Sequence, residues 1–259
     1  MQRYFVPATQ MGQQSVALEG EDARHAAAVM RSKPGDCFIA CDGQGRDVLA
    51  KIVTVDKDNV HADIMEELTS NAEMAWQVTV AQSLPKGDKL EIVIQKGTEA
   101  GAVAFQPFLS QRTVVQYDDR KEAKRIERWR KIAKEASEQS HRSLIPTINA
   151  VLTWKSLIKQ FAEFDLVLLC YEEEGRAGNE TGNGLRDVLR EFKQSQSSTA
   201  PRVMVVIGPE GGLTAQEAET AAASGAKLIG LGKRILRTET AALFALACLA
   251  YESGELGGN

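Results

Sequence analysis

The sequence is poor in the residues from which metal centres and disulfide frameworks are built. Its 259 residues include four cysteines and three histidines. Cys37 and Cys41 are close in sequence, but no second Cys or His pair lies nearby to complete a tetrahedral metal site. Cys170 and Cys248 stand alone. We therefore expect no metal site, and reduced structural thiols of the kind found in cytoplasmic proteins.

Long apolar runs and an excess of positive charge are also lacking. No run approaches the roughly 18 residues of a membrane span, and no signal-peptide pattern opens the chain, so we expect a cytoplasmic protein without a membrane partner. The net charge of −4 argues against coating nucleic acid through global charge, but it is compatible with a local basic patch. The Gly-x-Ser-x-Gly and His-Glu-x-x-His motifs are missing, which disfavours hydrolases.

The pattern of strands and turns divides the chain into two modules. Residues 1–70 hold short strand-like runs separated by turn signals such as Pro34-Gly35-Asp36, with one helix expected over 22–31, which predicts a small β-barrel. Residues 74–256 alternate between strands and helices, which predicts an α/β domain with a mainly parallel sheet covered on both faces. Its expected strands are 76–84, 105–109, 165–171, 203–207 and 228–231, and its expected helices 89–101, 120–141, 154–164 and 185–194.

Two glycine-rich segments follow strands of the second module. The first is Ile207-Gly-Pro-Glu-Gly-Gly212, and the second runs from Leu231 to Ala241. Junctions of this kind place backbone groups around a ligand at the carboxyl edge of a sheet. The first segment has neither the nucleoside-triphosphatase spacing nor the dinucleotide spacing of glycines, so the ligand belongs to another class. Thr214 is a suitable N-cap for the next helix, with Glu217 as its capping-box partner.

Charged residues beside these segments indicate a binding site. Arg234 and Arg237 stand in an apolar context, where two guanidinium groups suit a carboxylate, a phosphate or an internal Glu partner. Glu239 also fits a first-turn carboxylate of the last helix, which Thr238 or Thr240 would cap. The basic helix over 120–142 is compatible with a solvated face and with phosphate binding.

Together these motifs resemble the bacterial 16S ribosomal RNA uridine-N3 methyltransferases (the RsmE family) of the SPOUT class. The likeness runs nearly end to end. Besides the two glycine-rich segments it includes Arg3-Tyr-Phe-Val-Pro7, the stretch from His25 to Arg31, Gln95-Lys-Gly-Thr-Glu-Ala-Gly101, the stretch from Ile132 to Arg142, and Pro146.

The resemblance implies a PUA-like RNA-binding barrel followed by a SPOUT-type parallel sheet with a C-terminal deep trefoil knot. The knot would form an S-adenosyl-L-methionine pocket at the interface of a homodimer. The partner would be 16S rRNA, within the small ribosomal subunit. The cofactor would be held by Leu169, Ile207, Gly208, Pro209, Gly211, Gly212, Leu231, Gly232, Ile235, Leu236 and Thr238. The RNA would be contacted by Arg3, His25, Arg31, Arg112 and Arg128.

The implied reaction needs help from the protein at N3 of the uridine. Neutral uridine carries a proton on N3, so the protein must remove this proton or stabilise the anion spread over the flanking carbonyl oxygens. A carboxylate could do the first and an arginine the second. The candidates are Glu210 or Glu239 for the base, and Arg237 or Arg142 for the anion. Two rival interpretations stay open: a non-catalytic RNA-binding protein, and a SPOUT methyltransferase that acts on another RNA site.

Overall fold

The computed structural model describes residues 1–69, 72–115, 120, 122–171 and 184–257. The chain divides into two compact units, one of residues 1–73 with 134–145, and the other of residues 74–133 with 146–259. The sequence predicted modules of 1–70 and 74–256. The segment 134–145 belongs to the first of the two observed units, although the prediction included it in the second module. A glycine-rich acidic loop expected between strand 165–171 and helix 185–194 lies almost wholly outside the described residues.

The first unit is built on a five-stranded sheet with the order β1-β3-β4-β5-β2. Its strands are β1 (Arg3–Phe5), β2 (Ser15–Glu19), β3 (Cys37–Cys41), β4 (Asp47–Val55) and β5 (Asn59–Leu68). β1 pairs with β3 in parallel, and the other pairs are antiparallel. Alternate residues such as Val16, Leu18, Phe38 and Val60 point into one apolar core, as expected of strands with one buried face.

The helix of this unit differs from the single helix expected over 22–31. An α-helical turn, α1 (Gly20–Arg24), continues as a π-helix over His25–Val29. The wider turn is closed by the Met30 N–H, which donates to the His25 carbonyl at 2.9 Å. The chain then leaves the helix through Arg31, whose φ of 54° is unusual for a residue other than glycine. A short 3-10 turn, Ala8–Gln10, lies between β1 and β2.

The second unit contains a seven-stranded sheet in the order β12-β10-β11-β6-β7-β8, with β9 also paired to β7. All of these pairs are parallel, which confirms the predicted α/β class. The strands are β6 (Gln77–Ser83), β7 (Ala104–Leu109), β8 (Thr147–Ile148), β9 (Leu152–Thr153), β10 (Leu166–Cys170), β11 (Arg202–Ile207) and β12 (Lys227–Ile229).

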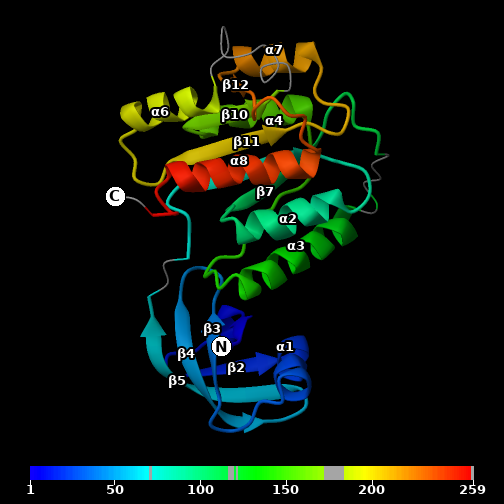
Figure 1. The fold of residues 1–259 in the computed structure, drawn as a ribbon. Coiled ribbons are helices and arrows are strands. Elements are labelled where there is room, and N and C mark those ends of the chain that lie inside the picture. The colour runs from blue at the N-terminus through cyan, green and yellow to red at the C-terminus, as the bar shows by residue number, and fades with distance from the viewer. Residues whose placement is uncertain (70–71, 116–119, 121, 172–183, 258–259) are drawn as a thin grey trace. The chain divides into compact units, whose positions relative to one another are not determined.

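Helices cover both faces of this sheet (Figure 1). α2 (Lys89–Glu99) and α8 (Thr238–Glu252) pack side by side on one face, while α4 (Trp154–Gln160) and α7 (Ala215–Ala223) contribute to the core on the other. α6 (Leu185–Ser195) follows the undescribed segment, and a 3-10 turn, Phe161–Glu163, extends α4. α3 (Glu122–Gln139) is divided between the two units after Ala133. Within the described residues, no helix has the length and apolar character needed to cross a membrane.

The two glycine-rich segments lead into the first turns of α7 and α8. Thr214 caps α7, and its capping box with Glu217 is present as predicted. The prediction for α8 was wrong, because Arg237 occupies the N-cap position and makes no side-chain cap. Thr238 is instead the first helical residue, and its hydroxyl donates to the carbonyl of Gly208 at 2.7 Å. Thr240 is an exposed residue of the first turn.

Candidate active site

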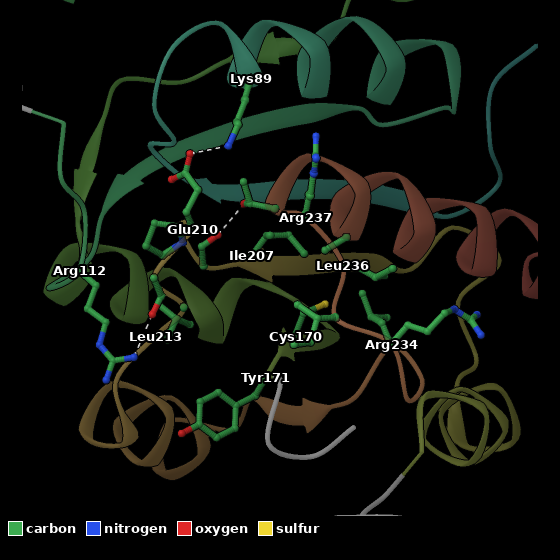
Figure 2. A pocket seen from close by; sticks show the side chains of 18 of the residues that line it. Lys89, Arg112, Cys170, Tyr171, Ile207, Glu210, Leu213, Arg234, Leu236 and Arg237 are labelled. Carbon is green, nitrogen blue, oxygen red and sulfur yellow. Dashed lines mark hydrogen bonds and ion pairs between the residues drawn. The ribbon is translucent and has the colours of Figure 1, made fainter. Parts of the chain in front are cut away.

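The carboxyl ends of β10, β11 and β12 border a cavity of about 480 Å³ (Figure 2). This volume is within the range of small-molecule sites, and strand ends of this kind are the usual ligand site of α/β sheets. The wall is formed by Lys89, Arg112, Cys170, Tyr171, Ile207, Gly208, Pro209, Glu210, Gly211, Gly212, Leu213, Leu231, Gly232, Lys233, Arg234, Ile235, Leu236, Arg237, Thr238 and Ala241.

The cavity brings together all but one of the residues expected to hold the cofactor. Leu169 is the exception, because its side chain is fully buried in the core on the face of α4 and α7. Successive residues of a strand point to opposite faces, so its neighbour Cys170 lines the cavity instead. The wall combines apolar side chains, such as Ile207 and Leu236, with backbone at glycine positions.

The first glycine-rich turn favours glycine at two of its positions. A Cβ atom on Gly208 would lie 3.2 Å from the backbone nitrogen of Leu213, and Gly212 has a φ of +68°. The first position therefore requires close approach of the backbone, and the second a left-handed conformation. Both conditions bring main-chain groups of the turn to the cavity wall.

Glu210 extends from this turn to Lys89, a residue that the sequence analysis did not single out. Lys89 Nζ donates to Glu210 Oε1 at 2.8 Å (Figure 2). The backbone N–H of Lys86 donates to the same oxygen at 3.0 Å. Burial by itself would raise the pKa of Glu210, but the hydrogen bonds from Lys89 and from backbone N–H groups outweigh it and lower this pKa.

Glu239 lies in the first turn of α8, and its side chain is 15% exposed. Its Oε2 atom is 4.0 Å from Lys89 Nζ. That oxygen is buried and accepts no hydrogen bond within the described part of the chain. Glu239 itself is not part of the cavity wall, although Arg237 and Thr238 beside it are.

Arg234 and Arg237 line the cavity, are exposed, and extend in different directions from the second segment (Figure 2). Among the residues that the structure describes, neither forms an ion pair. Arg112 reaches the cavity from another side and donates to the carbonyl of Gly211 at 2.9 Å. Arg112, expected to bind RNA, thus supports the glycine turn.

Two arginines among the predicted site residues are buried in the first unit, where ion pairs hold them. Arg142 is 2% exposed, and its Nη2 atom lies 2.6 Å from Glu73 Oε2. Arg3 is 6% exposed, and its Nη1 atom lies 2.6 Å from Asp47 Oδ2. Both guanidinium groups are paired with carboxylates here, and separating either pair would leave an unpaired charge. The contacts expected of them with a uracil anion and with RNA stay predictions.

The remaining predicted RNA contacts have accessible side chains or partial exposure. Arg31 is exposed. His25 is half-buried, and its Nδ1 atom lies 3.0 Å from the Tyr4 hydroxyl. Arg128 is exposed on α3 and donates to Glu91 at 2.6 Å. A surface ion pair of this kind is weak enough to exchange for a phosphate.

Comparison with known proteins identifies the family. A model described as an RNA methyltransferase domain matches residues 72–250, and an RNA methyltransferase PUA domain matches residues 18–65. The chain is 40% identical over 264 residues to Ribosomal RNA small subunit methyltransferase E of Bacillus subtilis (strain 168), with both chains fully covered. The chain belongs to the ribosomal RNA small subunit methyltransferase E family. A Synechocystis member is 34% identical over 248 residues, covering 95% of this chain and 76% of its own.

Two solved methyltransferase structures share the fold of this chain. Ribosomal RNA small subunit methyltransferase E of Neisseria gonorrhoeae, bound to S-adenosyl methionine, has a TM-score of 0.81 at 29% identity and covers 97% of each chain. A Legionella pneumophila methyltransferase in complex with the bound cofactor SAM has a TM-score of 0.82 at 29% identity, covering 99% of this chain and 98% of its own. The PUA-like character of the N-terminal unit is thereby confirmed.

Proposed function

We propose that this protein transfers a methyl group from S-adenosyl-L-methionine to N3 of a specific uridine in 16S rRNA. The observation that carries the proposal is the cavity at the strand ends, walled largely by the two glycine-rich segments 207–212 and 231–241. Support comes from the full-length likeness to a small subunit rRNA methyltransferase and from the cofactor bound by a structural relative.

The residues of the cavity suit this cofactor. Apolar side chains of Ile207, Leu213 and Leu236 offer contacts for an adenine ring, and the glycine positions let backbone groups approach its polar edges. The guanidinium groups of Arg234 and Arg237 offer a charged partner for a carboxylate. When bound, the cofactor supplies an electrophilic methyl group.

The chain's own part is to prepare N3 of the uridine. We assign the removal of the N3 proton to Glu239 rather than Glu210, because Lys89 and backbone N–H groups already hold Glu210 in its ionised form. A carboxylate with a lowered pKa is a weaker general base. Arg237, which lines the cavity beside Glu239, would stabilise the uracil anion. Arg142 has no part in this scheme.

The decisive experiment measures methylation of small subunits that lack the modification, with the product nucleoside mapped by mass spectrometry. Arg237→Ala and Glu239→Gln should each lower the rate by about 100-fold or more, with thermal stability retained, since general acid–base groups contribute about that much. Wild-type rates in both folded variants would remove these residues from the chemistry. Absence of cofactor binding in calorimetry would favour a non-catalytic RNA-binding protein, and a different modified nucleoside would identify another RNA target.

The location of the cofactor can be tested separately by blocking the cavity. Leu231 is half-buried in the wall, so Leu231→Trp places an indole there without disturbing the core. We expect cofactor affinity to fall by about tenfold or more, which corresponds to about 1.4 kcal/mol. Leu256→Trp, at a 66% exposed position outside the wall, is the matched control and should bind normally. Unchanged affinity in Leu231→Trp would place the cofactor elsewhere.

The RNA contacts belong to both units. N3 lies on the Watson–Crick edge, so the target uridine must be unpaired when it reacts. We propose that Arg31 and His25 of the PUA-like unit, with Arg128 of α3, contact backbone phosphates of the rRNA in the small subunit. Substituting Arg31 or Arg128 with Ala should weaken binding and reduce its salt dependence.

The resemblance extends this proposal to the assembly of the protein. We propose a homodimer in which each chain threads a C-terminal trefoil knot around the cavity, acting in the cytoplasm where ribosomal subunits are available. Support for this proposal comes from two loops that meet in one wall of the cavity. The Thr238 hydroxyl donates to the carbonyl of Gly208, 30 residues earlier in the sequence, and both residues line the cavity.

A further inference from the structure

A buried glutamine lies behind the cavity wall. Gln82 is the penultimate residue of β6, and its side chain is fully buried. Its Nε2 atom donates to Thr238 Oγ1 at 2.8 Å and to the backbone carbonyls of Ser83 at 3.1 Å and Gly208 at 3.4 Å. Because two of these partners are carbonyl oxygens, which only accept, the amide nitrogen and not the oxygen must face them.

Thr238 extends this interaction into a directed chain of hydrogen bonds. Its hydroxyl accepts from Gln82 and donates to the Gly208 carbonyl at 2.7 Å. A hydroxyl has one proton, so the order Gln82 N–H to Thr238 O–H to Gly208 C=O is the arrangement that satisfies all three groups. Such a chain strengthens each of its bonds in a buried site.

Thr238 and Gly208, which the hydrogen bonds from Gln82 join, belong to the two glycine-rich segments that wall the cavity. Gly208 opens the turn after β11, and Thr238 lies in the second segment at the start of α8. β6 is paired with β11 in the middle of the sheet, with Gln82 opposite Ile207, so Gln82 sits on a rigid element. The hydrogen-bond chain therefore fixes the separation of the two walls.

We infer that Gln82 is a positioning residue that sets the width of the cofactor cavity without contacting the cofactor. This inference rests on the proposed function, because it takes the cavity as the cofactor site. Gln82 is not part of the cavity wall. Its Oε1 atom is buried and accepts no hydrogen bond from the described residues, which is unfavourable for stability. An apolar residue would avoid that penalty, so the amide is explained by what its nitrogen holds in place.

A second buried glutamine provides a matched control. Gln106 on the neighbouring strand β7 is 2% exposed, and its Nε2 atom donates to the carbonyls of Pro107 at 3.0 Å and Ala150 at 2.8 Å. Neither carbonyl belongs to the cavity wall. Gln82→Leu and Gln106→Leu thus remove the same group from the same sheet, but only the first separates the two segments.

The test is calorimetric titration of S-adenosyl-L-methionine into the full-length variants, with thermal unfolding measured in parallel. We expect Gln82→Leu to weaken binding by about tenfold or more, and Gln106→Leu to change it by less than about threefold at a comparable loss of thermal stability. In methylation assays Gln82→Leu should raise KM for the cofactor while kcat stays within about threefold.

Equal affinities in Gln82→Leu and Gln106→Leu would overturn the inference. Should Gln82→Leu fail to fold, Gln82→Met keeps the length of the side chain, and its comparison with Gln106→Met decides the same question. Leu231→Trp separates this inference from the proposed function. Normal binding in Leu231→Trp would remove the cofactor from the cavity, whereas loss there with normal binding in Gln82→Leu would retain the site and reject only the role of Gln82.

Discussion

The ammonium group of Lys89 lies between two carboxylates, 2.8 Å from Glu210 and 4.0 Å from Glu239. Since it donates a hydrogen bond to Glu210 and not to Glu239, the two carboxylates are not equivalent. Glu210 is stabilised as an anion, and Glu239 keeps a buried oxygen with no hydrogen bond from the described chain. This asymmetry separates the two candidate bases, which the sequence left equal.

Glu210→Gln should therefore methylate at a rate within about threefold of wild type, whereas loss of a true general base costs about 100-fold or more.

The contribution of Glu210 to the stability of the fold should depend on pH in a defined direction. The pKa of Glu210 is lowered in the folded protein, so its ion pair stabilises the fold above the ordinary carboxyl pKa of about 4.3 and loses this effect as pH falls through the lowered value.

Thermal unfolding of wild type and Glu210→Gln, measured at neutral pH and at about pH 3, tests this direction. The difference in Tm between the two proteins should be smaller at the acid pH. A 100-fold loss of activity in a Glu210→Gln variant of normal stability would return Glu210 to the chemistry and contradict the assignment of Glu239.

Cys170 lies in the cavity wall but is a poor nucleophile. Burial, with a smaller contribution from Cys248, raises its pKa to about 12. The thiol therefore stays protonated until the pH approaches that value, and only the thiolate is reactive. In mildly alkaline buffer, iodoacetamide should modify the exposed Cys37 and spare Cys170, as read by peptide mass spectrometry. All four thiols should react in the unfolded chain. Equal labelling of Cys37 and Cys170 in the folded protein would contradict this account.

At the scale of elements, the sequence predicts what is local and misses what is not. β10 and β11 are continuous apolar runs because both faces of the sheet are covered, and the helix α6 between them suits their parallel pairing. β8 and β9 have two residues each, too few to show a period. The predicted threonine cap of α8 failed because the Thr238 hydroxyl binds a carbonyl 30 residues away.

The residues of the candidate site likewise fall into those that a local sequence signal predicts and those that it does not. The glycine-rich turns carry local signals, since Gly208 and Gly212 need a conformation or a spacing that few residues allow. Lys89 and Gln82 carry none, because their partners Glu210 and Thr238 lie 121 and 156 residues further along the chain. Only the parallel arrangement of β6 and β11 brings these pairs together.

Gly97 in the middle of α2 provides a test of packing between elements. A Cβ atom there would lie 2.8 Å from the ring of Phe105 on β7 and 3.5 Å from Leu246 of α8. Phe105 and Leu246 are fully buried, so they cannot easily yield. Gly97→Ala should therefore destabilise the protein by about 1–3 kcal/mol, although alanine would favour an isolated helix by about 1 kcal/mol. Chemical denaturation measures the difference, and a stabilised variant would contradict the close packing.

At the scale of the whole molecule, α8 is apolar on the side that faces solvent as well as on the side that faces the sheet. Ala242, Ala245, Leu246 and Leu249 are buried against the unit. Thr240, Phe244, Ala247 and Tyr251 recur at helical spacing on the opposite side and are exposed, Phe244 by 41% and Tyr251 by 69%. A helix that is hydrophobic all round is normally buried. This surface fits the homodimer that we propose.

Phe244→Lys should convert the proposed dimer into a monomer, because a charge at the centre of an apolar interface would be buried without a partner. Light scattering during size-exclusion chromatography measures the change. Val53→Lys, at a 49% exposed apolar position on β4 of the first unit, is the control and should remain dimeric. The Tm of wild type should rise with protein concentration, as mass action requires of a dimer, and that of Phe244→Lys should not. A wild-type protein that elutes as a monomer, with a Tm independent of concentration, would rule out the dimer and leave the apolar side of α8 to another partner.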